Sequence, residues 1–321
     1  MLKEDFKNYT EKYMGRYLED CESVEPPDRP FALVIMGQPG SGAHRIVAKL
    51  CAERFGENPE GRDRRPAIVC EEDFMYGHRL ARKLLARHLD IQMEDVSGEA
   101  SRLEKECLRG LVSAGRDILW VTKGEDRDIT PNTLKMMQLG GYRLEVVFLA
   151  VPGRISAVKA IVEYEWLKQR NGLAFIPIGS RYLDSIRSLA QICYSVEKRR
   201  LADRILVLDG AGMELCAYGI PAPTPPDGKK TEARGAILRE QLREITPREY
   251  RGCLEMIITA ASGMDNRNAP SGERYIAAGL INRLFPNNPE ALYLSRVRVA
   301  KNPPHGLPQI NAALMRSVLT K

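Results

Sequence analysis

A glycine-rich segment near the start of the chain has the residue types and the spacing of a loop that binds phosphate. Gly37 and Gly42 are separated by four residues, and a third glycine, Gly40, lies between them. The segment reads Gly37-Gln38-Pro39-Gly40-Ser41-Gly42-Ala43-His44. Glycines at this spacing let backbone amides approach an anion closely. A glycine turn that binds nothing is the alternative, but the position directly after an apolar run favours descent from a phosphate-binding loop. These eight residues are therefore the nucleotide-binding candidates.

Two side chains of the usual pattern are missing from this loop. Ala43 occupies the lysine position, and His44 occupies the position of serine or threonine. The lysine neutralises phosphate charge and the hydroxyl binds magnesium. Alanine carries no charge, and imidazole is a poor ligand for this hard, oxygen-seeking ion. We therefore expect weak binding of ATP and magnesium at best, and no other metal site. Residual anion binding by the loop amides stays open.

The elements around the loop predict an α/β domain. Residues 31–36 are an apolar run that predicts a buried strand, and residues 44–55 have the spacing of an amphipathic helix. Further strands are expected at 67–70, 117–121, 144–151, 204–208 and, shorter, 215–218. Further helices are expected at 77–88, 99–114, 130–139, 155–170 and 185–198, with Trp120 and Trp166 in the core. Such alternation predicts a parallel sheet covered by helices on both faces, which is a three-layer P-loop kinase type of fold.

The chain extends beyond this domain at both ends. Residues 1–27 predict an N-terminal helix, and residues 28–219 are expected to form the P-loop kinase-type domain. The proline-rich segment 220–230 predicts an extended linker, and residues 231–321 predict a mostly helical C-terminal module. We expect the module to be a separate folding unit, so that its deletion leaves the α/β domain soluble.

The surplus of positive charge lies in this C-terminal third. From Gly219 onward there are 15 Lys/Arg and 9 Asp/Glu, which accounts for the whole net charge of +6. A basic surface can meet an acidic protein partner, nucleic acid or an anionic membrane. The arginines are scattered and few aromatic residues accompany them, so nucleic acid is not expected. A solvated helical surface is the simpler alternative to a protein-binding one.

The cysteines and the hydropathy predict a cytoplasmic protein. Seven cysteines lie far apart, with no metal-binding spacing and no disulfide pattern, which predicts reduced thiols. No apolar run reaches the length of ~18 residues that a membrane-spanning helix needs. Charges stand where a secretory signal would be apolar. No membrane contact is expected.

Several segments, taken in order, resemble the zeta toxins, a family of P-loop kinases of UDP-N-acetylglucosamine. The loop Gly37-Gln38-Pro39-Gly40-Ser41-Gly42 is similar to the start of the family's loop. Residues 68–74 with His78 resemble its Asp-x-Asp segment and following histidine, and residues 147–152 resemble its Met-Ala-Val-Pro strand end. Glu163-Tyr164-Glu165 stands where the family has Arg-Tyr-Glu. The resemblance covers about residues 31–218 and implies that Asp73 is the catalytic base, or its vestige.

The departures from the family fall on the chemistry. The resemblance implies a glutamate after the third strand, but the chain reads Val121-Thr122-Lys123-Gly124. It implies two catalytic arginines, but Glu163 occupies one position and Phe175 the other. Arg170, Arg181 or Arg187 are the candidates to replace them. An engineered change at Ala43 would explain that position alone, whereas natural degeneration explains all of them.

Two kinds of function follow. The preferred interpretation is a pseudokinase that acts by binding a protein partner through its cleft or its basic C-terminal module. The alternative is an active ATP-dependent phosphotransferase that acts on a nucleotide sugar such as UDP-N-acetylglucosamine, or on another small metabolite. In either case the protein could act as a toxin or as an effector delivered into another cell.

Overall fold

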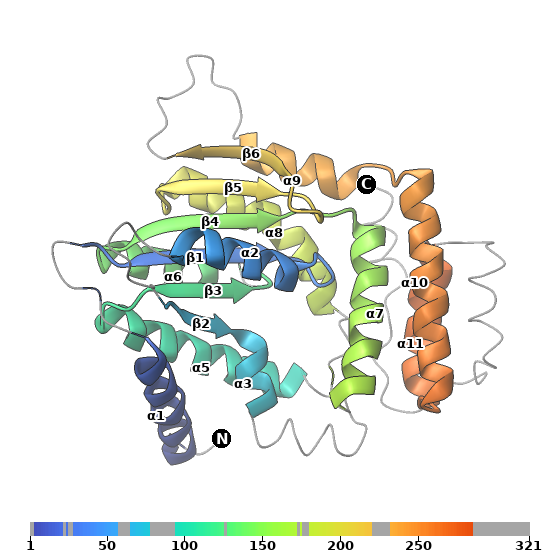
Figure 1. Cartoon of the computed structure of the whole chain (residues 1–321), viewed down its shortest axis with the longest axis horizontal. Coiled ribbons are helices and arrows are strands. Elements are labelled where there is room, and N and C mark those ends of the chain that lie inside the picture. The colour runs from blue at the N-terminus through green and yellow to red at the C-terminus, as the bar shows by residue number, and fades with distance from the viewer. Residues whose placement is uncertain are drawn as a thin grey trace.

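A computed structural model describes residues 3–21, 24, 28–56, 65–77, 94–124, 127–171, 174, 180–219 and 232–284. Its centre is a six-stranded sheet in the order β2-β3-β1-β4-β5-β6 (Figure 1). The strands are β1 (Phe31–Gly37), β2 (Ala67–Cys70), β3 (Ile118–Thr122), β4 (Arg143–Leu149), β5 (Arg204–Leu208) and β6 (Glu214–Gly219). The first five are parallel. β6 runs antiparallel to β5, because the short connection between them cannot hold a crossover.

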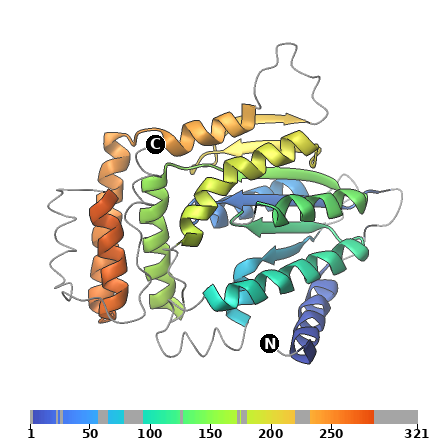
Figure 2. The ribbon, with the colours of Figure 1, turned by 180° about the vertical axis from the view of Figure 1, so that it is seen from behind.

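Helices cover both faces of the sheet, which confirms the predicted fold class. α2 (Ala43–Phe55) lies on the face seen in Figure 1, and α5 (Glu94–Ser113), α6 (Ile129–Leu139), α8 (Ser180–Arg199) and α9 (Glu232–Leu242) lie on the other, seen in Figure 2. β1 shows why both faces are apolar. Ala32, Val34 and Met36 pack in the core under α5 and α8, while Phe31, Leu33 and Ile35 pack in the core under α2.

The carboxyl ends of β1 to β5 point to one edge of the sheet, where α7 (Gly153–Asn171) stands (Figure 1). α10 (Pro247–Asn266) packs against α7, and α11 (Ser271–Leu284) also contacts it. A buried charge cluster joins these three helices: Arg267 pairs with Glu165 of α7 and with Glu273 of α11. α1 (Lys3–Asp20) packs on α5, and α3 (Glu71–Gly77) follows β2 directly.

Most predicted elements lie within a few residues of their observed positions. One helix and the burial of one tryptophan differ from the prediction. Trp120 is buried as predicted, but Trp166 is 53% exposed, so that prediction is wrong. α7 packs against the glycine loop on one side and against α10 on another. Trp166 lies on an exposed side of α7, beneath the guanidinium of Arg170. α3 was not predicted. The predicted helix at 77–88 and the segments beyond 284 lie outside the described residues, apart from Gly77.

The C-terminal helices share cores with the α/β domain. Ala233, Ala236 and Ile237 of α9 lie in the same core as β1, β4 and β5. Cys253 and Ile257 of α10 lie in a core with α7. The predicted linker 220–230 lies outside the described residues, so the domain boundaries stay a prediction. None of the described helices is both long enough and apolar enough to cross a membrane.

Candidate functional site

The glycine loop joins β1 to α2 and presses against α7. Gly40 and Gly42 have φ values of +73° and +86°, a left-handed region that favours glycine. A Cβ on Gly40 would collide with the carbonyl oxygen of Ser156 and lie 2.7 Å from the backbone nitrogen of Ala160. The hydroxyl of Ser156 donates a hydrogen bond to the carbonyl of Pro39 at 2.6 Å. The loop therefore turns at two left-handed glycines and is held in place by α7, the helix that follows β4.

Two polar side chains of the loop, those of Gln38 and Ser41, make contacts within the protein. Gln38 is fully buried, and its Nε2 donates to the carbonyl of Val151 at 2.9 Å. Its Oε1 accepts a hydrogen bond from Nε2 of Gln241 in α9 at 2.8 Å. Ser41 is also buried, and its Oγ lies 2.5 Å from where a Cβ on Gly37 would be, so it points back toward the end of β1. Neither side chain is directed at a ligand.

His44, in the first turn of α2, forms an ion pair with Glu163 of α7. His44 Nε2 lies 3.2 Å from Glu163 Oε1, and the two side chains are 71% and 39% exposed. This hydrogen bond raises the pKa of His44, although desolvation acts in the opposite direction. Two positions that the sequence marks separately as departures from the expected pattern are therefore in contact with each other.

A second pair of charges lies beside the first. Lys123, after β3, places its Nζ 2.7 Å from Glu72 Oε1 in α3. Burial opposes ionisation of Glu72, but Lys123 and the hydrogen bond from Cys70 outweigh it and lower the pKa of Glu72 to about 2. Both Glu72 and Lys123 act electrostatically on His44. Near the glycine loop, the two acidic side chains Glu163 and Glu72 are therefore each paired with a basic side chain.

Asp73, the predicted base, follows Glu72 in α3. It lies at an exposed position, yet nearby protein atoms partly desolvate it and raise its pKa, against the effect of Arg16 and His44. Its backbone carbonyl accepts a hydrogen bond from the hydroxyl of Tyr13 in α1 at 3.0 Å. The structure therefore brings Asp73 within electrostatic range of the loop. His78 and Phe175, the other residues singled out here by resemblance, lie outside the described residues.

The side chains present do not fit magnesium. Magnesium prefers oxygen ligands in an octahedral arrangement, but His44 offers nitrogen and is engaged by Glu163, while the hydroxyl of Ser41 points away. Within the described part of the chain, no group of three His, Cys, Asp or Glu side chains is placed to hold a metal ion. Arg170, one of the arginines proposed as replacements, stacks on Trp166.

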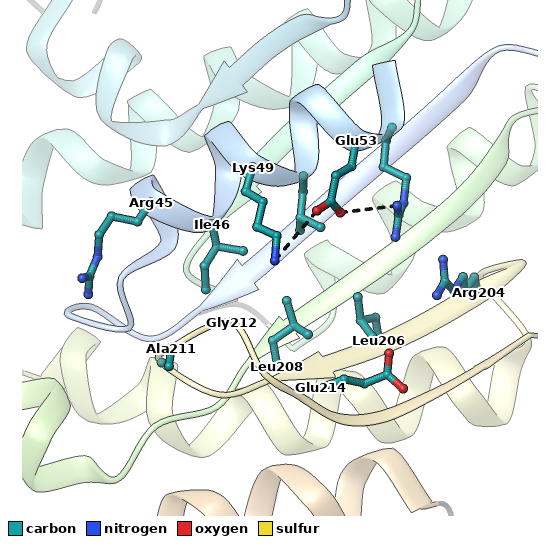
Figure 3. Close-up of a pocket in the computed structure, with 13 residues that line it drawn as sticks. Arg45, Ile46, Lys49, Glu53, Arg204, Leu206, Leu208, Ala211, Gly212 and Glu214 are labelled. Atoms are coloured by element: carbon teal, nitrogen blue, oxygen red, sulfur yellow. Dashed lines mark ion pairs between the residues drawn. The ribbon is translucent and has the colours of Figure 1, made fainter. Parts of the chain in front are cut away.

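The structure also shows a groove that the sequence did not indicate. A groove of about 290 Å³ lies between α2 and the β5–β6 hairpin, and we call it the α2 groove (Figure 3). Its apolar lining comes from Ile46 and Leu50 of α2 and from Leu206 and Leu208 of β5. Gly210 and Gly212 close the end next to the glycine loop, and Arg45 stands there. Lys159 of α7 lies near this end as well, with Nζ 3.5 Å from where a Cβ on Gly210 would be.

Comparison with known proteins gives the family. The sequence profile of the Zeta toxin family matches residues 15–216. The chain belongs to the zeta toxin family. A Toxin zeta from Streptococcus pyogenes is 24% identical over 164 residues, which cover 49% of this chain and only 54% of that protein. A Toxin zeta from Enterococcus hirae is 22% identical over 255 residues, which cover 78% of this chain and 82% of that protein.

Solved structures agree with the fold of a zeta toxin. A chain of the PezAT chromosomal toxin–antitoxin system of Streptococcus pneumoniae has a TM-score of 0.62 at 16% identity, over 83% of this chain and 97% of that chain. A chain of the AvrRxo1-ORF1:-ORF2 structure with ATP has a TM-score of 0.50 at 13% identity, over 91% of this chain and 87% of that chain. The family profile ends within β6, so α9, α10 and α11 of this zeta toxin relative lie beyond it.

Proposed function

We propose that this member of the zeta toxin family is a pseudokinase, which keeps the fold and the wrapped loop of a kinase but acts by binding a protein partner. The observation that carries the proposal is the ion pair between His44 and Glu163. By resemblance, His44 stands where a magnesium-binding hydroxyl belongs and Glu163 where a catalytic arginine belongs. Two parts of a phosphate-transfer site are replaced by side chains that bind each other.

The expected loss of activity is large. A positioned arginine can contribute ~10³–10⁵ in rate to phosphate transfer. Here a carboxylate paired with His44 stands at that position, so the positive charge that an arginine would bring to the γ-phosphate of ATP is missing. The lysine position is Ala43, which carries no charge. The missing arginine and the missing lysine act in the same direction, so transfer should be abolished.

A protein partner is supported by the solved relatives. One belongs to a toxin–antitoxin system, and another was solved as a complex of two different chains. In this chain the net positive charge of the C-terminal third suits an acidic partner surface. The hydrogen bond from Gln241 to Gln38 joins α9 to the glycine loop, so a partner bound at α9 would act on an element that contacts the loop directly. We place this binding in the cytoplasm, either of the producing cell or of a cell that receives the protein as an effector.

A transfer assay tests the pseudokinase directly. The purified full chain is incubated with ATP, magnesium and UDP-N-acetylglucosamine, and phosphorylated sugar is measured by mass spectrometry. We expect no product above that of buffer alone. The matched control is Asp73→Asn, which removes the only base candidate named here. Product that forms with the original chain and disappears with Asp73→Asn would establish an active phosphotransferase and end the proposal.

A second experiment tests the partner. The tagged chain is isolated from the cells that produce it, and co-purifying proteins are quantified. We expect one acidic protein at a constant ratio to the chain. A chain that is monomeric and alone under these conditions would contradict action through a partner.

A further inference from the structure

Several cationic side chains gather at the edge of the sheet that is opposite to the glycine loop. α6 ends at Leu139, shortly before β4 begins, and α8 ends at Arg199, shortly before β5 begins. The ends of these two helices therefore lie at the amino-terminal edge of the strands, on the face seen in Figure 2. α8 packs against both α6 and α9. We call this region the amino-edge surface, and its cations are Lys135, Lys198, Arg199, Arg200 and Arg234.

Contacts between side chains make the surface continuous from α9 to α8. Tyr194 of α8 is 39% exposed, and its ring centroid lies 5.8 Å from Lys198 Nζ and 5.2 Å from Arg234 Cζ of α9. Arg199 extends the surface toward α6, because its Nη2 donates a hydrogen bond to Asn132 Oδ1 at 3.3 Å. An aromatic ring between two cations therefore stands at one end of the surface.

Further hydrogen bonds join the end of α8 to α6. Gln138 Nε2 donates to the carbonyl of Arg200 at 2.8 Å, and Lys135 Nζ donates to Gln138 Oε1 at 2.9 Å. Leu139 is 76% exposed, and it lies on the same side of α6 as Lys135, one helical turn earlier. The other end of the surface therefore carries an exposed apolar side chain beside its cations.

The positive charge of the amino-edge surface is not neutralised by the described part of the chain. None of its cations forms an ion pair with a described residue. Glu197 of α8 is buried and accepts a hydrogen bond from the hydroxyl of Tyr218 in β6. Asp203, which follows α8, accepts one from the backbone nitrogen of Leu144 at 2.7 Å. Because these two carboxylates are engaged elsewhere, the surface is suited to an acidic ligand.

Helix dipoles explain only part of this arrangement. Lys198 and Arg199 are in the last turn of α8, where the helix dipole stabilises a cation. Arg234 is in the first turn of α9, where the dipole disfavours a cation. Its guanidinium lies against the ring of Tyr194. Tyrosine and arginine contribute much of the binding energy of protein interfaces. An arginine at an unfavourable position beside an exposed tyrosine therefore indicates a role in binding.

We propose that the amino-edge surface docks an acidic amphipathic segment of a protein partner. This inference rests on the proposed function and deepens it, because it assigns a place to the partner. Carboxylates of the segment pair with the cations, while its apolar side chains cover Tyr194 and Leu139. Nucleic acid fits this surface less well, because a single exposed ring among its described residues offers little stacking and phosphates do not cover a leucine.

The docking place is separate from the glycine loop. The loop follows the carboxyl end of β1, whereas the amino-edge surface precedes β4 and β5, which are parallel to β1. A docked segment therefore leaves the loop uncovered. α9 links the two places: Arg234 is in its first turn, and Gln241 in its last turn donates a hydrogen bond to Gln38 of the loop.

Fluorescence anisotropy with the full chain tests the surface. The probe is a labelled peptide of about 20 residues, or ~30 Å of helix, with leucines at helical spacing and glutamate at the other positions. Polyglutamate of the same length and a version with lysine in place of glutamate are the comparison peptides. We expect the leucine–glutamate peptide to bind at least about fivefold more tightly than polyglutamate, because leucine burial adds to charge pairing. The lysine version should not bind. Equal binding of the two acidic peptides, or binding of neither, would overturn the proposal.

Variants then assign the residues. The double variant Lys198→Gln with Arg234→Gln should bind the leucine–glutamate peptide at least about fivefold more weakly, on the scale of exposed ion pairs. The matched control is Arg248→Gln with Arg251→Gln, which removes two exposed cations of α10 and changes the net charge equally. We expect no change in the control. Equal loss in both double variants would show attraction by net charge alone and contradict the surface. Circular dichroism checks that each variant is folded.

Competition separates a protein partner from other anions. Single-stranded DNA and phosphatidylserine vesicles are each added to the labelled complex, with unlabelled leucine–glutamate peptide as reference. We expect the peptide to displace the probe at the lowest concentration. If the DNA or the vesicles displace it at a lower concentration than the peptide does, the surface recognises nucleic acid or membrane and the protein partner is wrong.

Co-purification distinguishes this inference from the proposed function. An acidic protein that co-purifies with the original chain should be lost from Lys198→Gln with Arg234→Gln and kept by the α10 control. If it stays with both, the partner binds elsewhere and the amino-edge surface is wrong, while action through a partner stands. These binding measurements do not depend on phosphate transfer, so transfer to sugar would end the pseudokinase proposal and leave the docking surface standing.

Discussion

His44 Nε2 of α2 lies 3.2 Å from Glu163 Oε1 of α7, across 119 residues of sequence. Each residue by itself is a departure from the loop and helix of a zeta toxin. By resemblance, Glu163 stands at an arginine position and His44 at a hydroxyl position, and the structure shows that these two side chains form an ion pair. An engineered change at Ala43 alone does not account for this pair.

The ion pair between His44 and Glu163 limits how much ATP affinity is gained when the missing lysine and hydroxyl of the loop are restored. We expect the double variant Ala43→Lys with His44→Thr to gain little ATP affinity, because Glu163 then faces the phosphates without its partner. Adding Glu163→Arg should raise the affinity by about tenfold over the double variant, on the scale of a hydrogen bond between charged groups. Calorimetry with ATP and magnesium measures both. Neither variant should transfer phosphate, since Phe175 stands at the other arginine position. Transfer by the double variant would show that the rest of the site is intact.

The ion pair between His44 and Glu163 can be detected by titrating the His44 ring. Glu163 raises the pKa of His44, so any stability from the pair is full below the ordinary histidine pKa of about 6.5 and is lost as pH rises through the raised value. Because both side chains are exposed, this stability should stay below about 1 kcal/mol. We expect the NMR titration of the His44 ring to shift to lower pH in Glu163→Gln. Glu53→Gln, which removes an exposed carboxylate of the same helix, should leave it unchanged. An unchanged His44 pKa in Glu163→Gln would contradict the contact.

Glu104 should make the protein less stable as pH rises. It is buried beside Trp120, whose indole nitrogen donates to it at 2.9 Å, and burial raises its pKa to about 8. Between its ordinary pKa near 4.5 and about 8, the unfolded chain loses this proton while the folded chain keeps it. The free energy of unfolding should therefore fall by at most about 1.4 kcal/mol per pH unit from this group.

Glu104→Gln keeps an acceptor for Trp120 and removes the titration. We expect its free energy of unfolding, measured in urea, to exceed that of the original chain at pH 8 and to match it more closely at pH 5. An equal difference at both pH values would show that Glu104 is ionised in the folded protein.

A chain that ends at Gly219 tests the predicted domain boundary. α9 places Ile237, which is fully buried, in the core of the sheet, and α10 covers α7. We therefore expect the shortened chain to lose its cooperative thermal unfolding. Ile237→Ala in the full chain should cost about 2–5 kcal/mol, the usual range for a buried isoleucine. If the shortened chain unfolds at an unchanged temperature, the boundary at 219 stands as the sequence predicts.

Much of the fold could be predicted because its signals are local. The apolar run before Gly37 and the alternation of strands with helices are properties of short segments, and β1, β2 and β5 lie where the sequence places them. α3 was missed because it is short and begins directly after β2, with Glu71, Glu72 and Asp73 in its first turn. Acidic residues there stabilise a helix through its dipole, but over seven residues they give no apolar periodicity.

The sequence by itself determined the glycine loop, the missing lysine and hydroxyl at Ala43 and His44, and the family resemblance, because each depends on residues close together in the chain. Only the tertiary structure decided that Glu163 pairs with His44 and that Lys123 pairs with Glu72. These contacts join elements far apart in sequence, and they exist because the strand order brings the carboxyl ends of β1, β3, β4 and β5 to one edge. A contact between distant residues depends on how whole elements pack, which no spacing along the chain records.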